Sequence, residues 1–150
     1  MTMTALEQKW AQEEAEKEPE LLDAYNDDGS ISIEKLDQSV RDRIPTPTGW
    51  RIVILPYQGA KKTKGGLVLT EKTVEKQQLT TVCGYVLSVG ELAYRDEAKF
   101  PEGPWCQEGD WVIFGRYAGA RIGLDGGEIR ILNDDEILAR INNPEDILHM

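Results

Sequence analysis

The sequence predicts a small, mostly β domain, an antiparallel barrel or sandwich, over residues 45–150. Short runs of β-branched and aromatic residues recur after residue 45, and glycine turns separate them. No stretch with helical periodicity longer than two turns occurs in this part of the chain. Residues 1–44 differ in composition and are predicted to form an acidic extension, partly helical or mobile.

The extension carries most of the negative charge of the chain. Residues 1–44 hold 12 acidic and 5 basic residues, a net charge of −7, against −3 for residues 45–150. Good helix formers dominate residues 4–24, which are predicted to be helical. Pro19 interrupts the helical pattern, and apolar residues from Leu21 to Tyr25 restart it. The apolar stripe is thin, so the extension could stay mobile or pack in part on a partner.

Residues 26–31, Asn-Asp-Asp-Gly-Ser-Ile, resemble the middle of a calcium-binding EF-hand loop. When the two are aligned on the glycine, Ala24 takes the first position of that loop and Lys35 the twelfth. Both obligatory carboxylates are therefore missing, and a cation at the twelfth position repels calcium. A turn is favoured instead, with Ser32 capping a short helix through Ile33–Val40.

Strand signals follow Pro45 and Pro47, which mark a boundary. The predicted segments are strands at 49–55, 80–89 and 109–114, a hairpin over 121–132 with its turn at Asp125-Gly126-Gly127, and a short closing segment at 134–141, helical or extended. Two long excursions, 57–78 and 91–108, interrupt these strands. Long excursions in a small barrel are usually functional or disordered.

The first excursion contains the run Lys62-Thr63-Lys64-Gly65-Gly66-Leu67-Val68-Leu69. Two glycines would keep the backbone loose, and the three aliphatic side chains would offer apolar surface to a partner's groove. A glycine turn followed by an ordinary strand fits the same eight residues. The neighbouring lysines either steer the loop towards an acidic surface or simply keep an apolar tip soluble.

Composition excludes several classes of function. A net charge of −10 argues against non-specific nucleic-acid binding, and no apolar run approaches the ~20 residues that span a bilayer. The N-terminus lacks the pattern of a secretory signal, so we expect a cytoplasmic protein with reduced thiols at Cys83 and Cys106. With His149 as the single histidine, neither a metal site nor a catalytic triad is expected. The glycine pairs form neither a Walker loop nor a GxGxxG motif.

From Pro45 to Ile141 the chain resembles the ten-kilodalton co-chaperonins (chaperonin 10), the GroES type that caps a GroEL-type chaperonin ring. Six segments carry the resemblance in the family's order: Arg51–Ile54, Lys62–Leu69, Gly84–Gly90, Glu108–Phe114, Arg116–Gly119 and Asp134–Ala139. Each segment alone is weak. Six in the right order with compatible spacing are hard to obtain by coincidence.

The resemblance implies a fold, an assembly and a role. Members are irregular GroES-like β-barrels that assemble as a homo-heptamer, a seven-membered dome in which terminal strands of neighbouring subunits pair. Gly65, Gly66, Leu67, Val68 and Leu69 would form the chaperonin-binding part of a mobile loop. The excursion at 91–108, with Tyr94, Phe100 and Trp105, would be the roof hairpin. The lid would enclose a chamber for a folding client protein, with no catalytic residues and no cofactor of its own, because the partner ring binds ATP or ADP.

The chain departs from the family pattern in two places. It has an acidic leader of 44 residues, and its roof excursion is rich in aromatic residues and proline. These additions suggest a specialised relative, of viral (phage) or cellular origin. An enzyme domain with an alcohol-dehydrogenase-like barrel is the first alternative, but it would need zinc ligands and a dinucleotide domain. A structural module, such as a virion component that uses the leader as an arm, is the second; it predicts a loop that is ordered without a partner.

Overall fold

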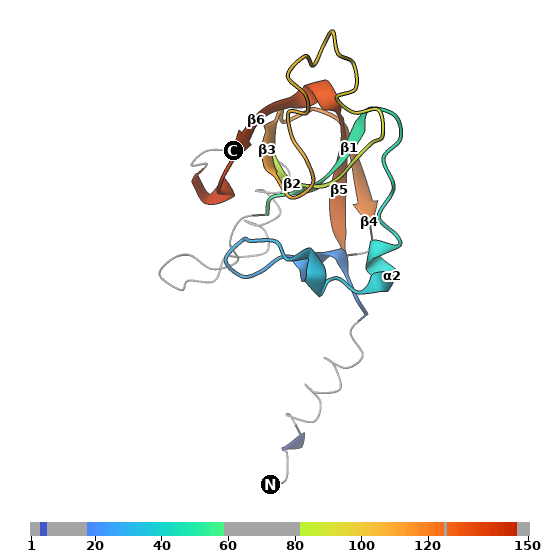
Figure 1. The fold of residues 1–150 in the computed structure, drawn as a ribbon. Helices are drawn as coiled ribbons and strands as arrows, with labels where there is room; N and C mark the ends of the chain where they lie inside the picture. Colours follow the sequence, from blue (N-terminus) through green and yellow to red (C-terminus); the bar gives the residue numbers. More distant parts are fainter. Residues whose placement is uncertain (1–3, 6–17, 59–81, 125, 147–150) are drawn as a thin grey trace.

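The computed structural model describes residues 4–5, 18–58, 82–124 and 126–146. Most of these residues form a six-stranded antiparallel sheet with the strand order β4-β5-β1-β2-β3-β6. The strands are β1 (Arg51–Pro56), β2 (Cys83–Val89), β3 (Trp111–Phe114), β4 (Ala120–Leu124), β5 (Gly127–Asn133) and β6 (Ile137–Ile141). The sheet curls into an irregular β-barrel (Figure 1), which confirms the predicted fold class.

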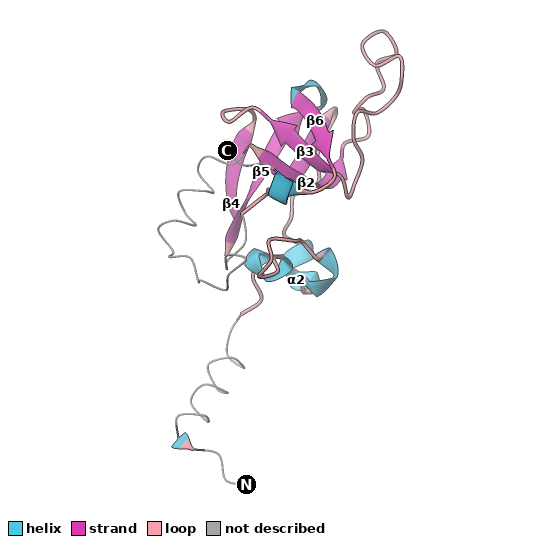
Figure 2. Cartoon of the chain, turned by 90° about the vertical axis from the view of Figure 1, so that its left-hand side faces the viewer, coloured by secondary structure: helices cyan, strands magenta, loops and turns pink. Residues whose placement is uncertain are grey.

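The helical segments are short. From residue 18 to residue 146, the described ones are the 3-10 turns η1 (Leu21–Ala24), η2 (Ile33–Lys35), η3 (Asp134–Glu136) and η4 (Pro144–Asp146), and the one-turn α-helix α2 (Gln38–Arg41). Figure 2 shows η2 and α2 grouped beside the strands. The prediction of one helix through Ile33–Val40 was therefore wrong. Asp37 caps α2 by accepting a hydrogen bond from the Ser39 amide, 2.9 Å away, whereas the Ser32 side chain caps neither turn.

The helix predicted over residues 4–24 falls largely outside the described residues, which leave out 6–17. Its described end is the single 3-10 turn η1. The turn predicted at residues 26–31 is confirmed: the Gly29 amide donates to the Asn26 carbonyl, and Gly29 has a φ of 90°. Lys35, which stands where an EF-hand needs a carboxylate, instead hydrogen-bonds the Asn26 side chain.

Strand β1 lies at the centre of the sheet, paired with β2 along one edge and with β5 along the other. Its residues 52–55 are all completely buried. Side chains of successive strand residues point to opposite faces, so burial of consecutive residues means that both faces of β1 are covered. This double burial explains why the sequence of β1 alternates only weakly.

The face of β1 that carries Ile52 and Ile54 belongs to an inner cluster. The other buried members of the inner cluster are Val86, Ala93, Tyr94, Phe100, Cys106, Val112, Phe114, Leu132 and Ile137. Four of these residues come from the excursion at 91–108, so the excursion supplies part of the barrel's own core.

The face of β1 that carries Val53 and Leu55 belongs to an outer cluster. Besides Ile129 of β5, its buried members all come from the acidic extension: Leu21, Ala24, Tyr25, Leu36 and Val40. The described part of the extension therefore packs on the barrel of its own chain (Figure 1, blue and cyan). We call residues 18–44 the cover.

Gly84 of β2 allows this close packing around β1. A Cβ atom there would lie 2.3 Å from Ile54 Cγ2 and 2.9 Å from the Leu55 carbonyl oxygen. We expect Gly84→Ala to destabilise the barrel by about 3 kcal/mol, because overpacking forces backbone to move. Thermal unfolding followed by circular dichroism should show a Tm lower by roughly 10 °C.

Gly123 of β4 gives a matched control for this substitution. A Cβ atom at Gly123 would meet no heavy atom within 4 Å. Gly123→Ala should therefore leave the Tm nearly unchanged, and equal Tm values for the two variants would contradict the packing argument.

Candidate functional site

The predicted binding residues Gly65, Gly66, Leu67, Val68 and Leu69 lie outside the described residues, which stop at 58 and resume at 82. Their roles therefore stay predictions. The structure does describe the two ends between which they fall. We call these ends, residues 56–58 and 82–84, the loop root.

The loop root joins two neighbouring antiparallel strands. Pro56 at the end of β1 stands opposite Gly84 near the start of β2. One residue further, the Tyr57 amide donates a hydrogen bond to the Cys83 carbonyl over 2.9 Å. On the other side, the Phe114 amide of β3 donates to the Val82 carbonyl over 2.8 Å. The intervening excursion thus leaves and re-enters the barrel at one place.

Aromatic side chains pack beneath the loop root. The Tyr57 and Trp111 rings meet edge to face, with 5.7 Å between their centroids, and Trp111 meets Tyr85 in the same way at 5.6 Å. Such edge-to-face pairs add stabilisation beyond simple burial. Burial also raises the pKa of the Cys83 thiol to about 12, so this thiol stays protonated and is a poor nucleophile at neutral pH.

A tyrosine of the extension contacts the loop root, and sequence reasoning missed this contact. The Tyr25 hydroxyl donates a buried hydrogen bond to the Pro56 carbonyl oxygen over 2.6 Å. Tyr25 lies 31 positions before Pro56, so no local pattern reveals the pair. The sequence offered one signal for this contact: an aromatic residue beside a short apolar run, such as Tyr25 after Leu21 and Leu22, is expected to be buried.

The excursion at 91–108 is built around three aromatic rings. Phe100 packs edge to face against Tyr94 and against Trp105, with 4.9 Å between ring centroids in each pair. Tyr94 and Phe100 are buried, whereas Trp105 is 40% exposed. Residues 91–108 contain turns but no strand. The roof hairpin implied by the resemblance is therefore not formed by paired strands, and the excursion packs around these three rings instead.

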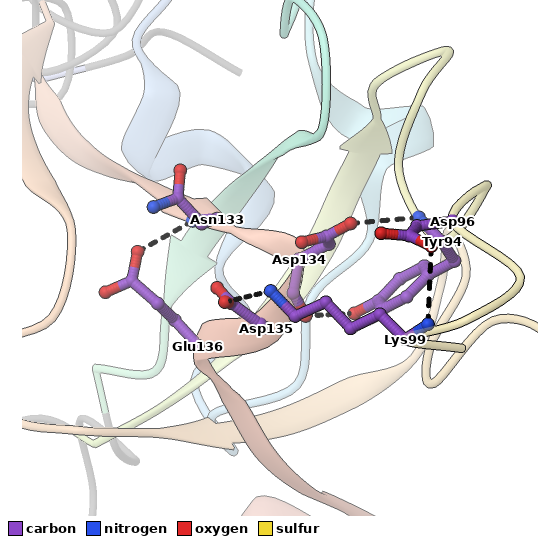
Figure 3. Close-up of polar contacts among 7 residues, drawn as sticks. All are labelled: Tyr94, Asp96, Lys99, Asn133, Asp134, Asp135 and Glu136. Atoms are coloured by element: carbon purple, nitrogen blue, oxygen red, sulfur yellow. Dashed lines mark hydrogen bonds and ion pairs between the residues drawn. The ribbon is translucent and has the colours of Figure 1, made fainter.

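Tyr94 ties this excursion to the closing segment of the barrel (Figure 3). Its φ of 62° is unusual for a residue other than glycine. The Tyr94 amide donates to Oδ2 of Asp134 over 3.0 Å, and its hydroxyl donates to the Asp134 carbonyl over 2.8 Å. Both acceptor atoms belong to Asp134, the first residue of η3. These two hydrogen bonds hold the strained backbone of Tyr94 in place.

A salt bridge adds to this connection on the outside. Lys99 Nζ lies 2.5 Å from Oδ2 of Asp135 (Figure 3). The same ammonium lies 5.7 Å from the centre of the Phe100 ring. The pair is exposed, so its contribution to stability is small. Inside, the Tyr94 hydroxyl lies 3.4 Å from Sγ of Cys106, and burial raises the pKa of that thiol.

The described residues show no constellation for metal chemistry. Within residues 4–5, 18–58, 82–124 and 126–146, no group of three or more His, Cys, Asp or Glu residues is placed to hold a metal ion. Both cysteines are unpaired thiols. No helix in these ranges has the length and apolar character needed to cross a membrane.

Comparison with known proteins assigns the fold to a family. Residues 45–141 match the family described as the chaperonin 10 Kd subunit, and the chain belongs to this family. The match spans all six strands and both excursions and begins after the cover.

Individual relatives agree with this assignment. The chain is 39% identical over 95 residues to the co-chaperonin GroES of Natranaerobius thermophilus, a match that covers 63% of this chain and 95% of the relative. The co-chaperonin GroES of Thermotoga neapolitana is 38% identical over 95 residues, with 63% and 92% covered. Co-chaperonin GroES 1 of Rhodopirellula baltica is 37% identical over 95 residues, with 63% and 89% covered.

Proposed function

We propose that this chain is a co-chaperonin that caps a GroEL-type chaperonin ring and encloses a folding chamber for a client protein. The observation that carries the proposal is the family match over residues 45–141, with relatives named co-chaperonin GroES. The aliphatic run Leu67-Val68-Leu69 belongs to the excursion that connects the end of β1 to the start of β2, which are paired with each other. In this proposal it enters an apolar groove of the partner ring.

The energetics of such a loop favour reversible capping. Burying Leu67, Val68 and Leu69 contributes ~1.5–3 kcal/mol for each side chain. Ordering a dozen or more loop residues opposes this by ~1 kcal/mol or more per residue. The ordering cost is at least as large as the gain from burying these three side chains, so one loop alone binds weakly. Loops joined on one ring bind with an avidity that is higher by ~10²–10⁴, without any new contact.

Assembly into a homo-heptameric ring is part of the proposal. The pairing among the described residues leaves the outer edge of β6 without a partner strand. Leu138, the second residue of that strand, is 69% exposed. An unpaired strand edge with an exposed leucine is suited to pairing with a neighbouring subunit.

The proposed lid has no catalytic role and needs no cofactor of its own. ATP or ADP would bind to the partner ring and control when the lid attaches, in the cytoplasm of the cell that supplies the chaperonin. The aromatic excursion with Tyr94, Phe100 and Trp105 would form the roof of the dome. Its tie to η3 makes this roof a fixed part of each subunit.

Native mass spectrometry tests the proposal directly. The chain would be measured alone, and then with a GroEL-type ring in the presence and absence of nucleotide. We expect a heptamer alone, and a complex of the ring with seven added chains only when ATP or ADP is present. A monomer that never binds the ring would refute the proposal.

A further inference from the structure

The cover is fitted closely to the barrel at its beginning. Leu21 is completely buried, and the Leu22 amide donates to the Gly126 carbonyl over 3.2 Å. A Cβ atom at Gly127 would lie 2.9 Å from Cδ2 of Leu21. The glycine turn between β4 and β5 thus leaves space that the cover fills, as expected of a contact built into the fold.

A short, hydrogen-bonded turn then fixes the position of Tyr25. Tyr25 forms a β-bridge with Ile31, and the Ser32 amide donates to the Ala24 carbonyl over 2.8 Å. Inside this turn, the Asn26 amide donates to the Ser30 carbonyl over 2.9 Å. The backbone on both sides of Tyr25 is therefore held, and its side chain is presented in one direction.

The Tyr25 side chain points to the loop root. The Tyr25 hydroxyl donates to the Pro56 carbonyl over 2.6 Å, and the Gln58 side chain hydrogen-bonds the same hydroxyl. Tyr25 and Gln58 are both buried. Burial raises the pKa of Tyr25 far above its usual value, so the hydroxyl stays protonated and can donate at neutral pH. One tyrosine thus contacts two of the three residues on this side of the loop root, Pro56 and Gln58.

We infer that the cover braces the loop root, and that Tyr25 is a positioning residue for the chaperonin-binding loop. The brace itself follows from the contacts of residues 18–58. Its role in binding a chaperonin rests on the proposed function.

The brace would act by limiting the directions in which the excursion leaves the barrel. Binding is weakened by every degree of freedom that must be frozen, so a fixed root lowers the entropy lost when the loop docks. The effect on one loop is modest. Because the loops of one ring bind together, a modest change in each loop is multiplied in the affinity of the whole lid.

Two tyrosine variants separate positioning from simple loss of stability. Tyr25→Phe and Tyr94→Phe each remove one buried hydroxyl that donates to a backbone carbonyl, of Pro56 in the first case and of Asp134 in the second. Tyr25 contacts the loop root, which adjoins the start of β2, whereas Tyr94 belongs to the roof excursion, which follows the end of the same strand. Similar losses in Tm are expected for the two variants.

The first measurement is amide hydrogen exchange of the free ring, read by mass spectrometry on peptides that contain Tyr57 and Cys83. We expect exchange at these root amides to be about tenfold faster in Tyr25→Phe, and unchanged in Tyr94→Phe. Equal acceleration in both variants, or no acceleration in Tyr25→Phe, would overturn the brace. This readout needs no chaperonin.

The second measurement is the Kd of the lid for a GroEL-type ring in the presence of ADP. We expect Tyr25→Phe to weaken binding by roughly tenfold or more, and Tyr94→Phe to bind as the wild type does. Faster root exchange with unchanged affinity in Tyr25→Phe would overturn the positioning role. If the wild-type chain itself fails to bind, the proposed function and the positioning role fall together, and hydrogen exchange still decides whether the brace exists.

Discussion

A chain that begins at residue 45 is expected to lose most of its stability, although the family match begins at that residue. Removing the cover exposes Val53, Leu55 and Ile129, which are all completely buried in the full chain. Each large apolar side chain that leaves the outer cluster removes about 1.5–3 kcal/mol of burial. Leu21, Tyr25 and their neighbours in the cover each contribute such a burial energy. Their sum is comparable with the whole free energy of unfolding of a domain, which is about 5–15 kcal/mol.

Urea unfolding followed by tryptophan fluorescence would measure this loss, with size-exclusion chromatography to detect aggregation. A chain that begins at residue 18 is the control, since it keeps every buried residue of the outer cluster. We expect it to unfold at the same urea concentration as the full chain. A 45–150 chain that is as stable and soluble as the full chain would mean that the cover is a dispensable appendage.

Replacing both Leu67 and Leu69 by serine is expected to abolish capping while the ring stays assembled. The double substitution removes roughly 3–6 kcal/mol of apolar burial from each loop, which exceeds the small net binding energy of one loop. Avidity cannot compensate, because it multiplies an affinity that each loop must first supply. Native mass spectrometry with a GroEL-type ring and ADP should show the free heptamer and no complex.

Leu92→Ser provides the matched control for the double serine variant. Leu92 is 57% exposed and belongs to the other excursion, so the same chemical change there should leave capping intact. Circular dichroism should be the same for all three proteins. A double variant that still caps would show that Leu67 and Leu69 are not the binding residues, whatever the role of the rest of the chain.

Local patterns predicted the strands well. The strand predicted at 49–55 is β1 at 51–56, and the Asp-Gly-Gly turn correctly placed the hairpin of β4 and β5. These features depend on neighbours in sequence: β-branched runs favour extended backbone, and glycine permits the turn. The family resemblance added the irregular β-barrel, which local patterns alone do not distinguish from a sandwich.

Long-range packing was the part that sequence patterns did not predict. The cover was expected to be an appendage because its apolar stripe is thin, yet Leu36 and Val40 are buried. Its partner strand did carry a signal, since four consecutive apolar residues in β1 indicate burial on both faces. The attachment of the roof excursion to η3 depends on the contact between Tyr94 and Asp134, which are 40 positions apart. No short-range pattern encodes such a pair.

The double burial of β1 also bears on how the chain folds as it is synthesised. The strand is an apolar run that favours aggregation until its neighbours cover it. Its partners in the sheet are made late: β2 begins at residue 83 and β5 at residue 127. The cover ends just before β1 and leaves the ribosome first, because synthesis proceeds from the N-terminus. The segment that covers one face of β1 in the finished barrel is thus synthesised before that strand, whereas both strands that pair with β1 are synthesised after it.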